Sequence, residues 1–404
     1  MKRLLVRIVL GCLLLLALVS CGAILLTQRD LHNLPPPKIV LGDCPDHLPS
    51  VSVTTPIPAA MAHTIYASSS GNLYALNART GALRWCRQVT IVGDFPCPGS
   101  CPPPPFIILG QPTVSDGAVY ICASGYGDGQ TYAFRASDGA LLWQAVSDCE
   151  VGSMPISDAA IPLVDHGIVY SGAAALQAHD GRIIWATHVG GSYFAPQALA
   201  DGVLYGNDAD SILALDADNG GVRWKYAPPG SIPGDRLTAS SGRVYVGMLE
   251  PGNELHVLDA ANGALLWTSA MAAESNPTVA NGMVYIGSSN NTLYALQATD
   301  GAIRWRYTAP SSVYIATTIV DGVAYAILDG PYAFDAATGG VLWHQSFGAS
   351  QNVSITPLAV AGDVVYLGRT DGEGHGTIYA LNAATGAVYW QISGIQPNVP
   401  LVVE

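Results

Sequence analysis

A single eleven-residue phrase recurs eight times along the chain, and each copy ends in one of its eight tryptophans. Aligned on the tryptophan, every copy has alanine at the fourth position and glycine at the seventh, as in ALNARTGALRW and ALNAATGAVYW. The tryptophans are Trp85, Trp143, Trp185, Trp224, Trp267, Trp305, Trp343 and Trp390. So regular a repeat restricts the fold to copies of one supersecondary unit that pack against one another.

The spacing and content of the repeat indicate that the unit is four β-strands. Successive tryptophans lie 58, 42, 39, 43, 38, 38 and 47 residues apart, and a period near forty with strand-like content is typical of a propeller blade. A tyrosine-containing strand such as VLYG or MVYIG precedes each phrase, usually after a tight-turn pair such as Asp116-Gly117. We therefore predict an all-β fold over residues 56–404, an eight-bladed β-propeller of four-stranded antiparallel blades.

The glycine and the tryptophan of the phrase have different expected tasks. Glycine closes the hairpin before the last strand because it accepts a positive φ without a side-chain clash. Tryptophan is large and has one N–H to satisfy, so we expect it to wedge between one blade and the next. Eight equivalent positions cannot each be one cofactor platform, and the tryptophans are therefore predicted to be structural.

The phrase resembles the tryptophan-docking motif of the quinoprotein-type (PQQ-like) β-propellers, over eight units from about residue 56 to the C-terminus. The resemblance implies an eight-bladed ring. That family includes pyrroloquinoline-quinone dehydrogenases and also the non-enzymatic lipoprotein of the outer-membrane β-barrel assembly machine. The lipoprotein resembles this chain more in size and in its membrane tether.

Two units depart from the regular pattern, and the end of the chain bears on ring closure. The third unit, IVYSGAAALQA, has almost no hairpin between its second and third strands, and the first has a long exit from Cys86 to Gln111. The chain ends in PLVVE, which resembles the first strand of other units. We predict that it pairs with the first blade, closes the ring and removes a free edge, so that deleting residues 396–404 lowers thermal stability.

The N-terminus predicts export and a membrane tether. Residues 1–26 have a basic start and an apolar run, which is typical of a signal peptide or an N-terminal anchor. Leu18-Val19-Ser20-Cys21 resembles a lipobox that would lipidate Cys21, whereas Ile8 to Leu26 is uncharged and long enough to span a bilayer. Both alternatives predict an extracytoplasmic, tethered protein. Residues 27–55, which include LPPPK, are assigned to a Pro-containing linker.

Cysteine usage and charge fit export. Six cysteines beyond Cys12 and Cys21 lie in the first third of the chain, and we expect disulfides, with fifteen possible pairings. They are Cys44, Cys86, Cys97, Cys101, Cys122 and Cys149. A metal site at CPGSC is the weaker alternative, because no histidine or second close cysteine pair accompanies it. The formal charge of −13 makes nucleic acid an unsuitable partner.

Motifs that would indicate a quinoprotein dehydrogenase or another enzyme are missing from the sequence. It has no adjacent cysteine pair, no CxxCH haem motif, no Ser-His-Asp motif and no HExxH zinc motif. We therefore expect no cofactor. PQQ with calcium belongs to an alternative function only.

A few acidic loops are candidate cation sites. Asp371, Glu373 and His375 alternate on the glycine-rich loop RTDGEGHGT, where oxygen ligands could converge on a cation. The simpler interpretation is a polar hairpin tip, and we favour it. The same applies to Asp208 and Asp210 in GNDADS and to Asp128 in GYGDGQ.

The fold also predicts where partners bind. In a four-stranded blade, the loops after the second and fourth strands share one face of the disc, and their lengths vary here. The predicted partner residues near the central funnel are Glu150, Tyr193, Phe194, Arg236, Glu274, Asn276, Tyr314, Gln351 and Asn352. We expect a monomeric, non-enzymatic scaffold for a protein partner at the cell envelope. A PQQ-binding protein or quinone-dependent oxidoreductase is the alternative, and a carbohydrate-binding or adhesive module a weaker one.

Overall fold

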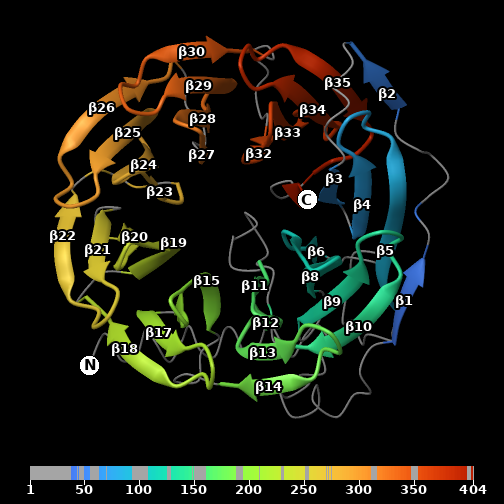
Figure 1. Ribbon diagram of the computed structural model, residues 1–404, viewed down its shortest axis with the longest axis horizontal. Coiled ribbons are helices and arrows are strands. Elements are labelled where there is room, and N and C mark those ends of the chain that lie inside the picture. The colour runs from blue at the N-terminus through green and yellow to red at the C-terminus, as the bar shows by residue number, and fades with distance from the viewer. Residues whose placement is uncertain are drawn as a thin grey trace, which may run out of the picture.

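In the computed structural model the repeats form eight antiparallel sheets arranged as a ring (Figure 1). The structure describes residues 38–42, 44, 50–54, 63–69, 71–92, 108–124, 129–147, 149, 161–187, 194–208, 210–228, 232–250, 254–269, 271, 273, 275–310, 316–346, 354–397 and 402–403. The sequence prediction of an all-β, eight-bladed propeller is confirmed.

Each blade runs from an inner strand to an outer strand that carries the tryptophan. Blades 1 and 2 are β36 (Val402–Val403), β3 (Thr64–Ser69), β4 (Asn72–Asn77) and β5 (Leu83–Val92), then β6 (Ile108–Leu109) with β7 (Thr113–Ser115), β8 (Ala118–Ser124), β9 (Gln130–Arg135) and β10 (Leu141–Val146). Blades 3 and 4 are β11 (Leu163–Asp165), β12 (Ile168–Ser171), β13 (Ala174–Gln177) and β14 (Ile183–Ala186), then β15 (Ala195–Ala200), β16 (Val203–Asn207), β17 (Ile212–Asp216) and β18 (Val222–Tyr226).

The second half of the ring repeats this order. Blades 5 and 6 are β19 (Ile232–Ser240), β20 (Arg243–Glu250), β21 (Leu255–Asp259) and β22 (Leu265–Ser269), then β23 (Thr278–Ala280), β24 (Met283–Ser288), β25 (Thr292–Gln297) and β26 (Ile303–Thr308). Blades 7 and 8 are β27 (Ala316–Val320), β28 (Val323–Ile327), β29 (Pro331–Asp335) and β30 (Val341–His344), then β31 (Ser354–Ile355) with β32 (Ala359–Ala361), β33 (Val364–Thr370), β34 (Gly376–Asn382) and β35 (Val388–Ser393).

Turn chemistry explains the hairpins. Between β7 and β8, Asp116 and Gly117 have φ values of 50° and 73°, the pair of positive angles that lets a two-residue turn match the strand twist. The short hairpin predicted in blade 3 is also present, since Ser171 pairs with Ala174 directly across it. Short turns of this kind fix the register and therefore which side chains face the neighbouring blades.

The core lies between blades. Tyr66 of blade 1 and Phe134 of blade 2, both fully buried, belong to one apolar cluster. The cluster between blades 6 and 7 contains Trp305 and Phe334 in the same way. A four-stranded sheet has two apolar faces here, so each blade needs both neighbours to keep water from its side chains.

The C-terminal strand closes the ring, as predicted from PLVVE. Val402 and Val403 in β36 pair antiparallel with Tyr66 and Ile65 of β3, so the last residues of the chain supply the innermost strand of the first blade. The C-terminus accordingly lies inside the ring beside β3 (Figure 1). The edge that an unpaired β3 would present is thereby covered.

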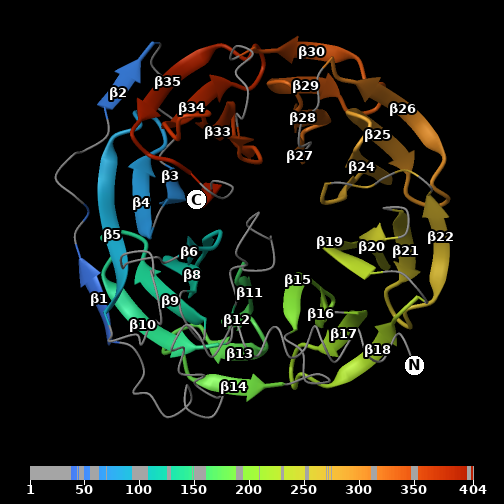
Figure 2. The ribbon, with the colours of Figure 1, turned by 180° about the vertical axis from the view of Figure 1, so that it is seen from behind.

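Two further strands lie within the segment that the sequence assigned to a linker. β1 (Lys38–Gly42) pairs with the outer edge of β5 in blade 1, and β2 (Ser50–Val53) pairs with the outer edge of β35 in blade 8. Both run along the outside of the ring (Figure 2). The N-terminal segment therefore spans the junction at which the first and last blades meet.

Within the described residues, four of the six candidate cysteines form disulfides. Cys44 is bonded to Cys86, and Cys122 is bonded to Cys149. Cys97 and Cys101 lie outside the described residues, as do Cys21 and the whole of residues 1–26. Within the part of the chain that the structure describes, no helix has the length and apolar character needed to cross a membrane.

Candidate functional site

The indole N–H of each docking tryptophan reaches the blade that follows it. All eight donate a hydrogen bond to the carbonyl of the alanine at the fourth position of the next phrase, at 2.8–3.3 Å. The pairs are Trp85–Ala136, Trp143–Ala178, Trp185–Ala217, Trp224–Ala260, Trp267–Ala298, Trp305–Ala336, Trp343–Ala383 and Trp390–Ala78. The position of the constant alanine in the sequence therefore supplies the backbone carbonyl that accepts the indole N–H.

The constant glycine lies under the tryptophan of the preceding blade. At Gly139, φ is +69°, and a methyl group built there would lie 2.6 Å from the indole of Trp85. All eight glycines of the phrase show this approach, with nearest ring atoms at 2.6–3.0 Å. Glycine is thus required twice, by the left-handed backbone and by the stacked ring.

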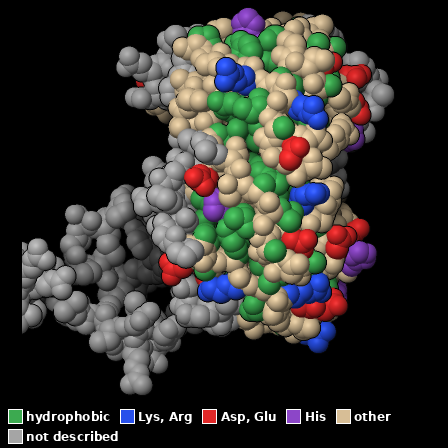
Figure 3. Space-filling model, turned by 90° about the vertical axis from the view of Figure 1, so that its left-hand side faces the viewer, with side chains coloured by type: hydrophobic (Ala, Val, Ile, Leu, Met, Phe, Trp, Pro, Cys, Tyr) green, Lys and Arg blue, Asp and Glu red, His purple; other side chains and the backbone are tan. Residues whose placement is uncertain are grey.

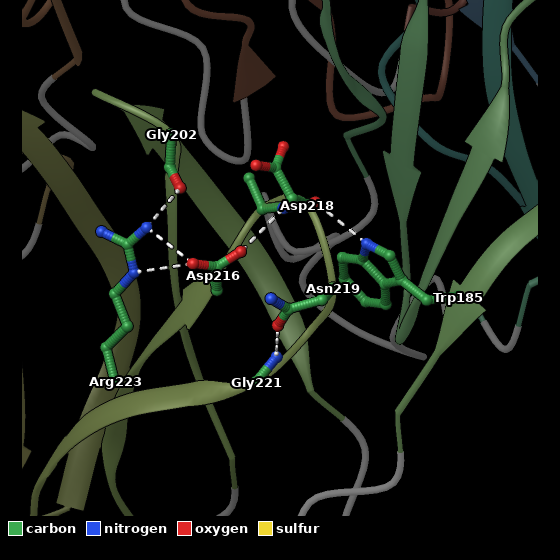
Figure 4. A network of polar contacts seen from close by, with 8 residues as sticks. Trp185, Gly202, Asp216, Asp218, Asn219, Gly221 and Arg223 are labelled. Carbon is green, nitrogen blue, oxygen red and sulfur yellow. Dashed lines mark hydrogen bonds and ion pairs between the residues drawn. The ribbon is translucent and has the colours of Figure 1, made fainter.

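Blade 4 shows how polar side chains build the same turn (Figure 4). Asp216 accepts the backbone N–H of Asp218 at 3.1 Å and the guanidinium of Arg223 at 2.8 Å, and the neighbouring Ala217 carbonyl receives Trp185. The Arg223 hydrogen bond, together with the turn N–H groups, holds the pKa of Asp216 below its ordinary value. Aspartate at this position serves the turn as a charged acceptor.

The outer strands expose apolar side chains around the rim of the disc (Figure 3). These residues sit one or two positions before the tryptophan on successive blades. They are Leu141, Leu142, Ile183, Ile184, Val222, Leu265, Leu266, Ile303, Val341 and Leu342. Because the exposure recurs with the repeat, it belongs to the blade pattern and does not mark one unique site.

The structure describes few of the predicted partner residues. Arg236 lies in β19, and Asn276 is half-buried just before β23. Phe194 is not on the surface: it is 2% exposed and packs in the core between blades 3 and 4, against Gly206 of β16. A large apolar ring next to the first strand of a blade is drawn into that core. Glu150, Tyr193, Glu274, Tyr314, Gln351 and Asn352 lie outside the described residues.

The acidic hairpin of blade 8 is organised by its own backbone. Asp371 accepts the N–H groups of Glu373 and His375 at 3.0 and 2.8 Å, and its second oxygen lies 3.3 Å from Nδ1 of His375. The His375 N–H is the largest cause of the lowered pKa of Asp371. These contacts are those of a polar hairpin tip. No group of three or more His, Cys, Asp or Glu residues in the described ranges is arranged to hold a metal ion.

Asp208 in blade 4 is buried and fully engaged. Its carboxylate accepts the Ser211 hydroxyl at 2.6 Å, the Asp210 N–H at 3.0 Å and the Lys225 ammonium at 3.1 Å. Burial by itself would raise the pKa of Asp208, but these donors outweigh it and the pKa is lowered. Asp208 therefore stabilises the loop after β16, and Asp128 lies outside the described residues.

One polar constellation was missed by sequence reasoning. The Tyr226 hydroxyl of blade 4 lies 2.9 Å from Nδ1 of His256 in blade 5, and Nε2 of His256 lies 3.3 Å from a Glu254 oxygen. Burial, and then the Glu254 charge, raise the pKa of Tyr226. The available signal was a histidine at a strand position where five other blades have tyrosine, but its partner comes from another repeat.

Comparisons with known proteins place the fold in a family. The sequence model described as "Outer membrane protein assembly factor BamB" matches residues 46–192, 170–250, 208–330 and 251–399. The chain belongs to this family. Its relatives include the BamB protein of Yersinia pestis, 24% identical over 65% of this chain and 66% of that protein, and a tetrathionate hydrolase of Acidithiobacillus ferrooxidans, 26% identical over 76% and 69%. The matches thus span about two thirds of these relatives.

Solved structures support the propeller fold alone. A computationally designed protein, Ika8, superimposes with a TM-score of 0.56 at 19% identity, covering 72% of this chain and 88% of that one. The quinohemoprotein alcohol dehydrogenase of Comamonas testosteroni gives 0.54 at 14% identity, covering 72% and 68%. At such identities the BamB-family chain shares an architecture with these proteins, and function has to be argued separately.

Proposed function

We propose that this BamB-family chain is a non-enzymatic, extracytoplasmic scaffold that is tethered to a membrane and binds a protein partner at the cell envelope. The observation that carries the proposal is the family match, which extends over nearly the whole propeller from residue 46 to residue 399. Four relatives named as outer membrane protein assembly factors match between 42% and 79% of this chain. We extend their role in assembly to this chain on that basis.

The disulfides support the compartment. Both bonds, Cys44–Cys86 and Cys122–Cys149, join residues well separated in sequence, by 42 and 27 positions. Bonds of this kind persist in oxidising compartments and are rare in the cytoplasm. The basic and apolar N-terminal sequence, with its candidate lipidation site at Cys21, supplies the proposed tether.

The two faces of the disc support a binding role. One face carries the uniform tight turns that each docking tryptophan needs, as at Gly139. The other carries loops of unequal length, from a two-residue turn at 172–173 to the polar hairpin at 371–375. Unequal loops on a rigid frame are where specificity is usually built, so we place the partner on that face.

Site-specific photocrosslinking in cells tests the scaffold. A crosslinker at Asn276 or Glu373, on the face with unequal loops, should capture one defined envelope protein. The matched control is Asp300 in the tight turn of blade 6, whose side chain accepts the Ala302 N–H and which should capture nothing specific. Equal capture from both faces, or no capture from the first, would contradict the proposal.

Cofactor binding is a second candidate, favoured by one observation. The dehydrogenase subunit of the quinone alcohol dehydrogenase of Gluconacetobacter polyoxogenes is 27% identical over 48% of this chain. If this chain is a PQQ binder or quinone-dependent oxidoreductase, calorimetric titration with PQQ and calcium will show saturable binding at one equivalent. Tight stoichiometric binding would replace the scaffold proposal, whereas a flat titration would leave it in place.

A further inference from the structure

The seam between blade 8 and blade 1 is built differently from the other interblade junctions of the described residues. Among the described strands, only these two blades have an additional outer strand, β2 on β35 and β1 on β5. The backbone pairing at β2 continues for one more residue, because the N–H of Thr54 donates to the carbonyl of Tyr389 at 2.7 Å. One N-terminal segment thus holds the outer edges of both blades, while β36 closes the inner edge of blade 1.

The disulfide Cys44–Cys86 lies within this seam. Cys44 falls between β1 and β2, and Cys86 follows Trp85 in β5. Cys86 belongs to the apolar cluster that joins blades 8 and 1 around Trp390, and Cys44 packs against the same cluster. The bond therefore ties the bridging segment covalently to one side of the junction.

The bridging segment also shields an outer-strand residue of blade 8. Tyr389, directly before the tryptophan, is 9% exposed, whereas Leu266 and Leu342 at the same place in blades 5 and 7 are 46% and 54% exposed. Release of β2 would leave β35 as an exposed outer strand, like the outer strands of blades 5 and 7. The seam would then keep the two-residue pairing of β36, the Trp390 and Tyr366 hydrogen bonds to Ala78 and the apolar cluster around Trp390, but would lose the backbone pairing on its outer edge.

The two disulfides in the described part of the chain differ in access. Cys122 and Cys149 are 0% and 2% exposed, and Cys86 is 7% exposed. Cys44 alone among the four is partly exposed. A reductant thiolate must reach a sulfur along the S–S axis. The exposure of Cys44 therefore makes Cys44–Cys86 the bond that is attacked first, and Sγ of Cys44 the atom that is attacked.

We propose that Cys44–Cys86 is a dithiol-reducible clasp across the ring seam, whereas Cys122–Cys149 is a permanent staple of blade 2. A thiolate of a dithiol reductant attacks Sγ of Cys44, the S–S bond breaks, and Cys86 leaves as a thiolate that takes a proton from water. The second thiol of the reductant then attacks the mixed disulfide and releases the Cys44 thiol. The two electrons come from the dithiol, which is oxidised to its own disulfide.

The first test measures the order of reduction. The full chain in detergent is treated with dithiothreitol under native conditions, quenched with an alkylating reagent at intervals and digested for mass spectrometry. Cys44 and Cys86 should be alkylated at least about tenfold faster than Cys122 and Cys149, in keeping with the exposure of Cys44. Equal rates, or reduction of Cys122–Cys149 first, would overturn the proposal.

The second test asks whether the bond holds the seam. Hydrogen exchange should rise in β1, β2 and the β3–β36 pair on reduction, and stay unchanged in β21 and β25 on the far side of the ring. The double variant C44S/C86S should reproduce this pattern, and the matched control C122S/C149S should leave β1 and β2 protected. Protein that is folded first and reduced afterwards gives the same comparison if a serine variant does not fold. Unchanged exchange in β1 and β2 would show that the bond is not a clasp.

Discussion

The indole N–H of Trp390 donates to the carbonyl of Ala78 at 3.1 Å, although 312 residues separate them in the chain. The same bond joins every other neighbouring pair of blades across only 31–51 residues, so this one marks the ring as closed. The Tyr366 hydroxyl donates to the same carbonyl at 3.2 Å. Closure therefore repeats the ordinary interblade contact and adds β36 to it.

The ring and the N–H of a docking tryptophan should make separate contributions to the free energy of unfolding. Trp305 is buried, donates to Ala336 at 2.9 Å and lies against Tyr285 and Phe334. W305F should lower the free energy of unfolding by about 1–2 kcal/mol, mainly through the lost hydrogen bond. W305A should lower it by about 3–5 kcal/mol, because it also leaves a cavity. Urea denaturation followed by circular dichroism measures both, and equal losses would assign the whole effect to the N–H.

Substitution of two glycines in blade 7 distinguishes the energetic cost of backbone strain from that of contact with the tryptophan ring. Gly339 and Gly322 have φ of +76° and +79°, but a methyl at Gly339 meets the Trp305 ring at 2.6 Å while one at Gly322 meets nothing within 4 Å. G322A should cost about 1–2 kcal/mol, the penalty for a left-handed residue with a side chain. G339A should cost clearly more, since the indole must also move. Thermal denaturation of the matched pair decides, and equal melting temperatures would contradict the docking geometry.

Ring closure should be visible in thermal stability. Deleting residues 396–404 removes both pairing residues of β36 and exposes the edge of β3. We expect the melting temperature to fall by about 5 °C, as for a loss of a few kcal/mol in a protein of this size. The control is deletion of Glu404 alone, which leaves Val402 and Val403 in place. A deletion that melts like the control would show that β36 does not close the ring.

Acid should destabilise the turn of blade 4. The hydrogen bond from Arg223 lowers the folded-state pKa of Asp216 below its ordinary value of 3.8. The folded state therefore binds this proton less readily than the unfolded state does. The resulting stabilisation is complete above about pH 4 and is lost as the pH falls through the folded-state pKa.

Asparagine variants test that linkage. D216N keeps a turn acceptor but removes the charge that pairs with Arg223, so its urea midpoint should fall less between pH 5 and pH 3 than that of the unaltered protein. Asp259 occupies the same position in blade 5 and accepts the Ala261 N–H at 2.9 Å, with Leu266 where blade 4 has Arg223. D259N makes the same change without an arginine partner and is therefore the matched control. If both variants behave alike, the arginine pair is not the cause.

The blade architecture could be predicted because the residues that determine it lie close together in the sequence and recur in every unit. The hairpin glycine, the turn at Asp116-Gly117 and the tryptophan all lie within one unit, and eight copies of the unit remove the ambiguity of any single copy. The strand-like PLVVE was recognisable by its likeness to other first strands. Its pairing with β3 then followed from the need to close the ring.

What the sequence did not predict depends on contacts between distant segments. β1 and β2 are short and follow a Pro-rich stretch, and only the open edges of β5 and β35 make them strands. Cys44 could have paired with any of five other cysteines until its position beside Cys86 was known. The burial of Phe194 was not predicted, because nothing in the sequence indicates that its ring lies against the backbone of β16 at Gly206.

Every docking bond points the same way round the ring, from the tryptophan of one blade to the alanine of the next. Synthesis from the N-terminus therefore finishes each tryptophan before the blade that receives it exists. A growing chain carries one unsatisfied indole at its leading blade and one vacant platform, Gly81 with Ala78, at its first. When the eighth blade has folded, its indole is the one left without an acceptor and the first blade has the one vacant platform. Assembly of the ring therefore has a direction, and it ends when these two groups meet.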